Sequence, residues 1–160
     1  MAWCRFNPPM WARLRQFRAL EPPVRRSFLF AALLLPLISA SLRLRGFAKT
    51  RAWLQKHFAT PQPSKELYSI CPNVTARMVR AAGRYGFSHP TCLQESLALW
   101  CILGRQGVPC DLRIGVRKHA EKFEAHAWVE RYGMPLNEAD GLHQHYAAFD
   151  SALASISPEP

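Results

Sequence analysis

Residues 90–107, PTCLQESLALWCILGRQG, predict the helix around which the rest of the chain is organised. Apolar residues recur along this stretch at helical spacing, namely at Leu93, Leu97, Trp100 and Cys101. Such spacing gives a helix one apolar face that can be buried. Gly107 supplies a stop, because glycine is favoured just beyond the last turn of a helix. One side of this helix is therefore expected to face the core.

The start of this helix carries a cysteine. Thr91 is a suitable N-cap, and Gln94 stands three residues later as the second half of a capping box. Cys92 then falls at the first helical position. The unpaired backbone N–H groups and the positive end of the helix dipole at that position favour a thiolate, the nucleophilic form of the side chain. Cys92 is therefore the first candidate for chemistry.

Composition predicts one compact domain that binds an anionic partner. The chain has 160 residues, of which 49% are hydrophobic, and this is enough for a sizeable core. Its formal net charge of +10 suits a membrane surface, a nucleic acid, or an acidic peptide or protein, unless the charge only keeps the protein dispersed. Five cysteines without CxxC spacing indicate neither a disulfide framework nor a zinc ribbon. A reducing cytoplasm is therefore expected.

Composition also divides the chain. Residues 1–60 are predicted to form a basic, hydrophobic helical extension, and residues 61–160 a folded domain, because residues 59–66, ATPQPSKE, have the composition of a linker. Within the extension, residues 27–42 are the most hydrophobic run, yet they fall short of the about 20 residues that span a bilayer. We expect a buried helix there, with peripheral membrane attachment or partner docking as the alternative.

Helices are also predicted at residues 10–20, 45–55 and 67–85, and the pattern changes after the Cys92 helix. Residues 111–116, DLRIGV, and residues 123–130, FEAHAWVE, alternate between apolar and polar side chains, which predicts two strands.

Residues 116–122 are expected to be a loop. A turn at 131–133 and a short third strand at 134–137 complete a hairpin. Residues 141–154 are expected to form a closing helix, followed by a frayed tail.

Three features then fall in an order with chemical meaning: a thiol at a helix start, a histidine in a strand, and polar groups one turn later. His126 is suited to hold Cys92 as a thiolate and to protonate a leaving group. Any of Asn137, Glu138 or Asp140 has an oxygen that would orient the imidazole ring. The backbone N–H of Cys92 would be one donor to an oxyanion.

Other residues of the same strand face are expected to contact a substrate. Trp128 and Glu130 share that face with His126, and Trp128 would either line the cleft or cover it as a lid that excludes water. Asn137 is expected to join them in substrate binding. The remaining histidines do not form a compact metal-ligand pattern, so we expect neither a metal nor an organic cofactor.

The residues also carry a family resemblance. The segment CLQESLALWCILGRQGVPCDLRIGV, followed by AHAWVE, a turn glycine, PLN and YAAFD, resembles the transglutaminase-like cysteine peptidases, and most of all the leader peptidases of lasso-peptide biosynthesis. The resemblance covers residues 90–150. It implies an α+β fold, with a transglutaminase-like or papain-like core in which the helix that starts at the nucleophile packs on a small antiparallel sheet.

The same resemblance implies site residues, with Cys92 as the nucleophile and His126 as the general base and acid. Family members usually place an Asp directly after the Asn of the PLN-like stretch, whereas this chain has Glu138 there and Asp140 two residues later. Asp140 is preferred as the third member, with Glu138 close behind it.

The implied function is removal of the leader from a ribosomally made precursor, before a separate ATP-dependent cyclase closes the macrolactam. The first 60 residues lack the strands of a fused leader-recognition domain, so the resemblance implies a separate recognition protein as a partner. The expected location is the cytoplasm, with peripheral contact at the inner face of the membrane as an open alternative. Nothing resembles a nucleic-acid-binding motif, so no nucleic-acid partner is expected.

Two other functions stay open at this stage. One is a non-catalytic binding module on the same fold, attached to a membrane or to another anionic partner through its basic N-terminal region. The other is acyl transfer from glutamine to an amine, because an acyl-enzyme on a Cys–His pair can react with water or with an amine.

Overall fold

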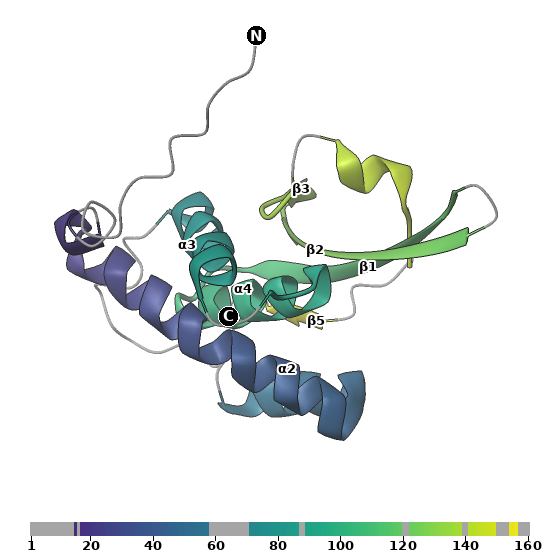
Figure 1. Ribbon diagram of the computed structural model, residues 1–160. Coiled ribbons are helices and arrows are strands. Elements are labelled where there is room, and N and C mark those ends of the chain that lie inside the picture. Colours follow the sequence, from purple (N-terminus) through teal and green to yellow (C-terminus); the bar gives the residue numbers. More distant parts are fainter. Residues whose placement is uncertain are drawn as a thin grey trace, which may run out of the picture.

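The computed structural model describes residues 15, 17–57, 71–86, 89–119, 122–138, 141–149 and 154–156. Its elements, in chain order, are α2 (Pro22–His57), α3 (Pro72–Tyr85), α4 (Cys92–Arg105), β1 (Cys110–His119), β2 (Lys122–Arg131), β3 (Met134–Pro135), the 3₁₀-helix η1 (Leu142–His145), β4 (Ala147–Ala148) and β5 (Ala154–Ile156). The antiparallel sheet has the order β3-β2-β1-β4, with β5 also paired to β1. Helix α4 contacts the sheet as well as α2 and α3 (Figure 1). The predicted α+β class is confirmed.

Helix α4 begins where the capping residues predict. The Thr91 hydroxyl accepts a hydrogen bond from the Gln94 backbone N–H at 3.4 Å, and the Gln94 side chain accepts one from the Thr91 N–H at 2.9 Å. Cys92 is the first helical residue, as expected. Burial exceeds the single face that the sequence predicts, because every residue from Ser96 to Gly104 is buried. The reason is that α4 lies between the other helices and the sheet.

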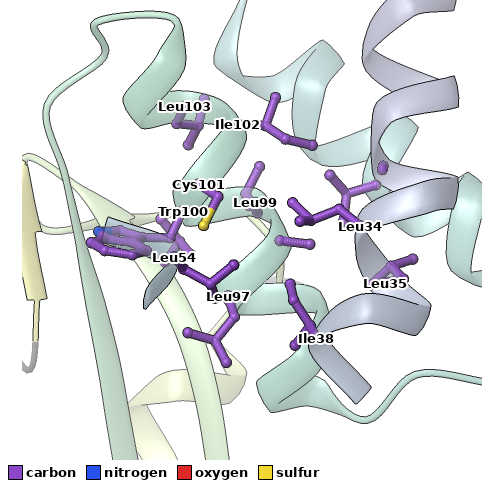
Figure 2. Packing of buried hydrophobic residues seen from close by; sticks show 14 of the residues in the cluster. Leu34, Leu35, Ile38, Leu54, Leu97, Leu99, Trp100, Cys101, Ile102 and Leu103 are labelled. Carbon is purple, nitrogen blue, oxygen red and sulfur yellow. The ribbon is translucent and has the colours of Figure 1, made fainter. Parts of the chain in front are cut away.

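One hydrophobic cluster joins α2, α3, α4 and the sheet. Leu34 and Ile38 of α2 point toward Leu99 and Leu97 of α4 (Figure 2), and all four side chains are at most 1% exposed. The helical extension that composition predicts at residues 1–60 supplies part of this core through α2. Residues 58–70, with the predicted linker, lie outside the described residues.

Helix α2 consists of two helical parts, before and after a kink at Gly46, which correspond to the helices predicted at residues 27–42 and 45–55. It runs for 36 residues and changes direction at Gly46, whose φ of 74° and ψ of 176° are not helical. Glycine tolerates a positive φ because it has no Cβ. Most of the predicted helix at residues 10–20, and the beginning of the one at 67–85, lie outside the described residues.

Strands β1 and β2 are longer than the sequence predicts. The register continues from Val116↔Ala125 to His119↔Lys122, so most of the predicted loop at residues 116–122 is strand. This part extends beyond the core, and its polar side chains bond across the strands, as Arg117 and Glu124 do at 2.6 Å. Such polar positions give no hydrophobic alternation, which is why the pattern misses them.

The turn from β2 to β3 is a two-residue hairpin turn. Tyr132 and Gly133 both have positive φ, 51° and 74°, as a type I′ turn requires. The third strand is confirmed, although it ends at Pro135.

The predicted closing helix at residues 141–154 is wrong. That segment holds the four-residue η1 and then β4 and β5, which pair with β1 at Gly115–Val116 and at Cys110–Leu112. The expected frayed tail begins inside β5. An unpaired strand edge presents free N–H and C=O groups, and these two short strands cover it.

Candidate active site

Two elements position the predicted thiol and imidazole. Cys92 stands in the first turn of α4, where the capping box holds the helix start, and its side chain is half-buried. His126 lies in β2, opposite Gly115 of β1. Within the described residues, no hydrogen bond joins the Cys92 sulfur to the His126 ring.

The imidazole has a carboxylate partner. His126 Nε2 contacts Oε1 of Glu138, whose side chain is 1% exposed, whereas the His126 side chain is 18% exposed. The hairpin turn brings Glu138 back alongside β2. A buried carboxylate against one ring nitrogen holds the ring in a fixed orientation.

Glu138, the second choice from the sequence, therefore occupies the position of a third site residue. Asp140, the first choice, lies outside the described residues.

A polar clamp docks the first half of α4 on β2. The Ser96 hydroxyl donates to the Ala127 carbonyl at 2.9 Å, and the Asn137 amide donates to the Ser96 hydroxyl at 2.9 Å. The Asn137 carbonyl oxygen accepts from the Val129 N–H at 2.8 Å. The side chains of Asn137 and Ser96 thus hold together α4, β2 and the segment that follows β3.

This clamp places the thiol end of α4 close to the imidazole strand. Cys92 precedes Ser96 by four residues and so lies on the same face of the helix, one turn nearer its start. Ala127, which Ser96 contacts, directly follows His126. The sequence reasoning missed Ser96, although its spacing from Cys92 and its polarity on an apolar helix were visible signals. Asn137 has a positioning role here, and its binding of substrate stays a prediction.

Two aromatic rings flank the imidazole. The His126 ring is stacked near the Trp128 ring, at a centroid distance of 6.0 Å, and lies 5.1 Å from the Tyr146 ring. Gly115 leaves room for both, because a Cβ there would lie 2.9 Å from the Trp128 ring and 2.9 Å from Tyr146 Cβ. Tyr146 was missed as a site residue because a closing helix was expected around it.

Trp128 and Glu130 are held from within the protein. The Trp128 indole N–H donates to Glu130 Oε1 at 2.7 Å, and Arg113 Nε donates to Glu130 Oε2 at 3.1 Å. Trp128 is only 1% exposed, so it is a packed wall beside His126. The predicted contact of Trp128 and Glu130 with substrate, and the lid function of Trp128, stay predictions.

The other described cysteines lie in different environments. Burial raises the pKa of the Cys101 thiol, and burial next to Asp111 raises that of Cys110 to about 12. These two thiols are therefore protonated and shielded near neutral pH. Cys71 is exposed and is the N-cap residue of α3.

The fold and the site together define a class of protein. It is an α+β protein in which a helix that starts at a cysteine packs on an antiparallel sheet, and the sheet carries a histidine paired with a buried carboxylate. The family model described as the transglutaminase-like superfamily matches residues 34–150, so the chain belongs to this superfamily. Its members are commonly cysteine peptidases or acyltransferases. Neither the curated proteins nor the solved structures gave a significant match.

Proposed function

We propose that this protein is a cysteine peptidase in which Cys92 is the nucleophile, His126 the general base and acid, and Glu138 the residue that orients the imidazole. The observation that carries the proposal is the contact between His126 and the buried Glu138 carboxylate, on the strand to which the Cys92 helix is clamped. In a cysteine peptidase, a carboxylate at this position would orient the imidazole.

The proposed reaction follows from these positions. Glu138 holds Nε2, so Nδ1 is the ring nitrogen that takes the proton from the Cys92 sulfur. The thiolate attacks the carbonyl carbon of the scissile bond, and the backbone N–H of Cys92 donates to the oxyanion. Collapse of this intermediate expels the amine, which takes the proton from His126. Water, deprotonated by His126, then hydrolyses the thioester and releases the enzyme.

The proposed substrate is the leader-bearing precursor of a lasso peptide. Support comes from the resemblance of residues 90–150 to the leader peptidases of lasso-peptide biosynthesis. The proposed partners are the precursor leader peptide, a separate leader-recognition protein that presents it, and an ATP-dependent macrolactam cyclase that uses the product.

The test is cleavage of a lasso precursor in the presence of its recognition protein, followed by mass spectrometry. The wild-type protein is expected to release the leader, and the Cys92→Ala and His126→Ala variants are expected to release none. Cys71→Ala is the matched control, since Cys71 also stands at a helix start but has no such histidine, and it should cleave at the wild-type rate. A fully active Cys92→Ala protein would end the proposal. If the acyl group of the precursor is recovered only as an amide with an added amine, and not as the free acid, the protein would be an acyltransferase instead.

We further propose that the protein works in the cytoplasm in peripheral contact with the membrane, through the outer face of α2. By length and composition α2 is apolar enough to cross a bilayer, with a mean hydropathy of 1.9 over its most apolar window. One side of it, however, is fully buried in the core. The opposite side exposes Leu29, Leu33, Leu37 and Leu44, at 48%, 69%, 51% and 84%.

Exposed Arg26 and Arg43 stand near the two ends of this leucine stripe, and α2 contains no Asp or Glu. An apolar stripe between basic ends is typical of a helix that lies in the plane of an anionic membrane surface.

A further inference from the structure

Helix α3 presents a row of arginines that the proposed reaction does not use. Arg77, Arg80 and Arg84 are exposed and follow one another at spacings of three and four residues, so they share one face of the helix. The helix contains no acidic residue. Within the described part of the chain, none of the three forms an ion pair, so their charge is available to a ligand.

These arginines line two adjoining hollows. The first, of about 200 Å³, is lined by Arg77, Arg80, Ala81, Arg84 and Tyr85. The second, of about 300 Å³, is lined by Arg80, Gly83, Arg84, His89, Pro90 and Glu95. Arg80 and Arg84 border both hollows, and the two together reach from α3 to the start of α4; we refer to this basic surface as the groove.

The second hollow reaches the first turn of α4, the helix that begins at Cys92. Glu95 follows Cys92 by three residues on α4, and side chains at this spacing are neighbours on a helix surface, with Cβ atoms about 5–6 Å apart. At this end of the groove, α3 packs closely against the start of α4. A Cβ on Gly83 would lie 2.7 Å from Pro90 Cγ and 2.8 Å from Glu95 Oε1.

The charge in the groove is positive but not uniform. Burial raises the pKa of the Glu95 carboxyl, and the positive charges of Arg80 and Arg84 partly oppose this shift. The Glu95 carboxyl group thus stands near the guanidinium groups of Arg80 and Arg84. Guanidinium groups are well suited to carboxylates, to which they can donate two hydrogen bonds at once.

We propose that this groove binds an acidic side chain of the peptide substrate next to the scissile bond. The proposal rests on the peptidase function proposed above. Arg80 and Arg84 would hold the substrate carboxylate, with Arg77 extending the site along α3. Glu95 would set a limit on affinity, since its charge competes for the same arginines.

The experiment measures peptide binding without turnover, by fluorescence anisotropy on the Cys92→Ala protein. The probes are a fluorescein-labelled decapeptide with four glutamates and its counterpart with four glutamines. In this background Arg84→Gln is expected to weaken binding of the glutamate peptide about fivefold or more, because a charge-assisted contact is lost. Glu95→Gln is expected to strengthen it. Arg45→Gln, at an exposed arginine of α2, is the matched control and should leave it unchanged.

Three results would overturn the proposal: equal affinity for the two peptides, an Arg84→Gln variant that binds as well as its parent, or a single-stranded DNA of equal charge that binds as tightly as the glutamate peptide. Because Cys92→Ala is inert in the proposed mechanism, binding by this protein is independent of cleavage. If the Cys92→Ala protein binds the glutamate peptide but the wild-type protein cleaves no precursor, the peptidase proposal is refuted. The binding of acidic peptides by the groove would then still stand.

Discussion

At the scale of single residues, the surroundings of each cysteine determine its chemistry. Cys71 and Cys92 both stand at helix starts. Of these two, only Cys92 belongs to α4, the helix that is clamped next to His126. Cys101 and Cys110 are buried thiols whose pKa is raised by desolvation.

The reactivity of these thiols tests the site without any substrate. We expect iodoacetamide at pH 7 to alkylate Cys92 about tenfold faster than Cys71, because the imidazole adds to the shared helix effect. Burial should protect Cys101 and Cys110 in the native protein. The measurement is peptide mass spectrometry after timed labelling.

In the His126→Ala protein, the rate at Cys92 should fall to that at Cys71. Equal rates in the wild-type protein would contradict an imidazole–thiol pair.

Glu138 is expected to matter more than Asp140. The Glu138→Gln variant should lower kcat for leader release by about 10²–10⁴-fold, because an amide orients the ring but does not stabilise the imidazolium ion. KM should change little. Steady-state kinetics on the precursor give both values.

The matched control for that measurement is Asp140→Asn, which should stay within about threefold of the wild-type kcat if Glu138 alone serves His126. A large loss in Asp140→Asn with an active Glu138→Gln would reverse the assignment.

At the scale of elements, the position of α4 depends on polar contacts inside an apolar interface. Apolar side chains of α2, α3 and the sheet pack around α4. Apolar contacts alone specify only loosely how far a helix slides along a sheet. The Ser96–Ala127 and Asn137–Ser96 hydrogen bonds define that position. The thiol and the imidazole strand thereby stay in register.

Removal of the clamp amide should therefore be costly. Asn137→Ala is expected to lower the free energy of unfolding by about 2–3 kcal/mol, because it strands the Val129 N–H and removes the donor to Ser96. Urea denaturation followed by circular dichroism measures this.

Asn73→Ala, at an exposed position of α3, is the matched substitution and should change stability by less than about 0.5 kcal/mol. Equal effects of the two variants would show that the clamp contributes nothing specific.

At the scale of the whole molecule, α2 has two different faces. Its buried side completes the core with α4, as Figure 2 shows, and its outer side carries the exposed leucine stripe. The formal net charge of the chain, +10, is of the sign that an anionic surface attracts. These features together support attachment in the plane of a membrane while the fold stays intact.

Vesicle flotation tests this attachment. The wild-type protein should float with vesicles that contain anionic phosphatidylglycerol and stay behind with neutral ones. Leu33→Glu and Leu37→Glu should each reduce flotation, because a carboxylate on the stripe opposes both burial and the anionic surface. The fold should survive, since the two side chains are 69% and 51% exposed.

Phe123→Glu is the control, at an apolar residue of β2 that is 78% exposed. Its flotation should match the wild type. In-plane attachment would be refuted if the wild-type protein does not float with anionic vesicles. It would also be refuted if the bound protein can be released from them only by detergent.

Much of the fold was predictable wherever its signals are local. The capping box, the alternation in β1 and β2 and the hairpin turn all lie within a few residues of the structure they specify. The strands β4 and β5 were not predictable from the sequence. Segments of two or three residues carry no periodicity, and these form strands only because β1 offers an open edge.

The sequence by itself determined that a helix begins at Cys92, because the groups that cap it are three residues apart and bond to each other whatever surrounds them. It also determined that His126 lies in a strand. Only the tertiary structure decided that Glu138 meets the imidazole, and that Asn137 and Ser96, 41 residues apart, hold the helix to that strand. The physical reason is that such contacts depend on strand register and on how layers pack, and both are properties of the assembled core.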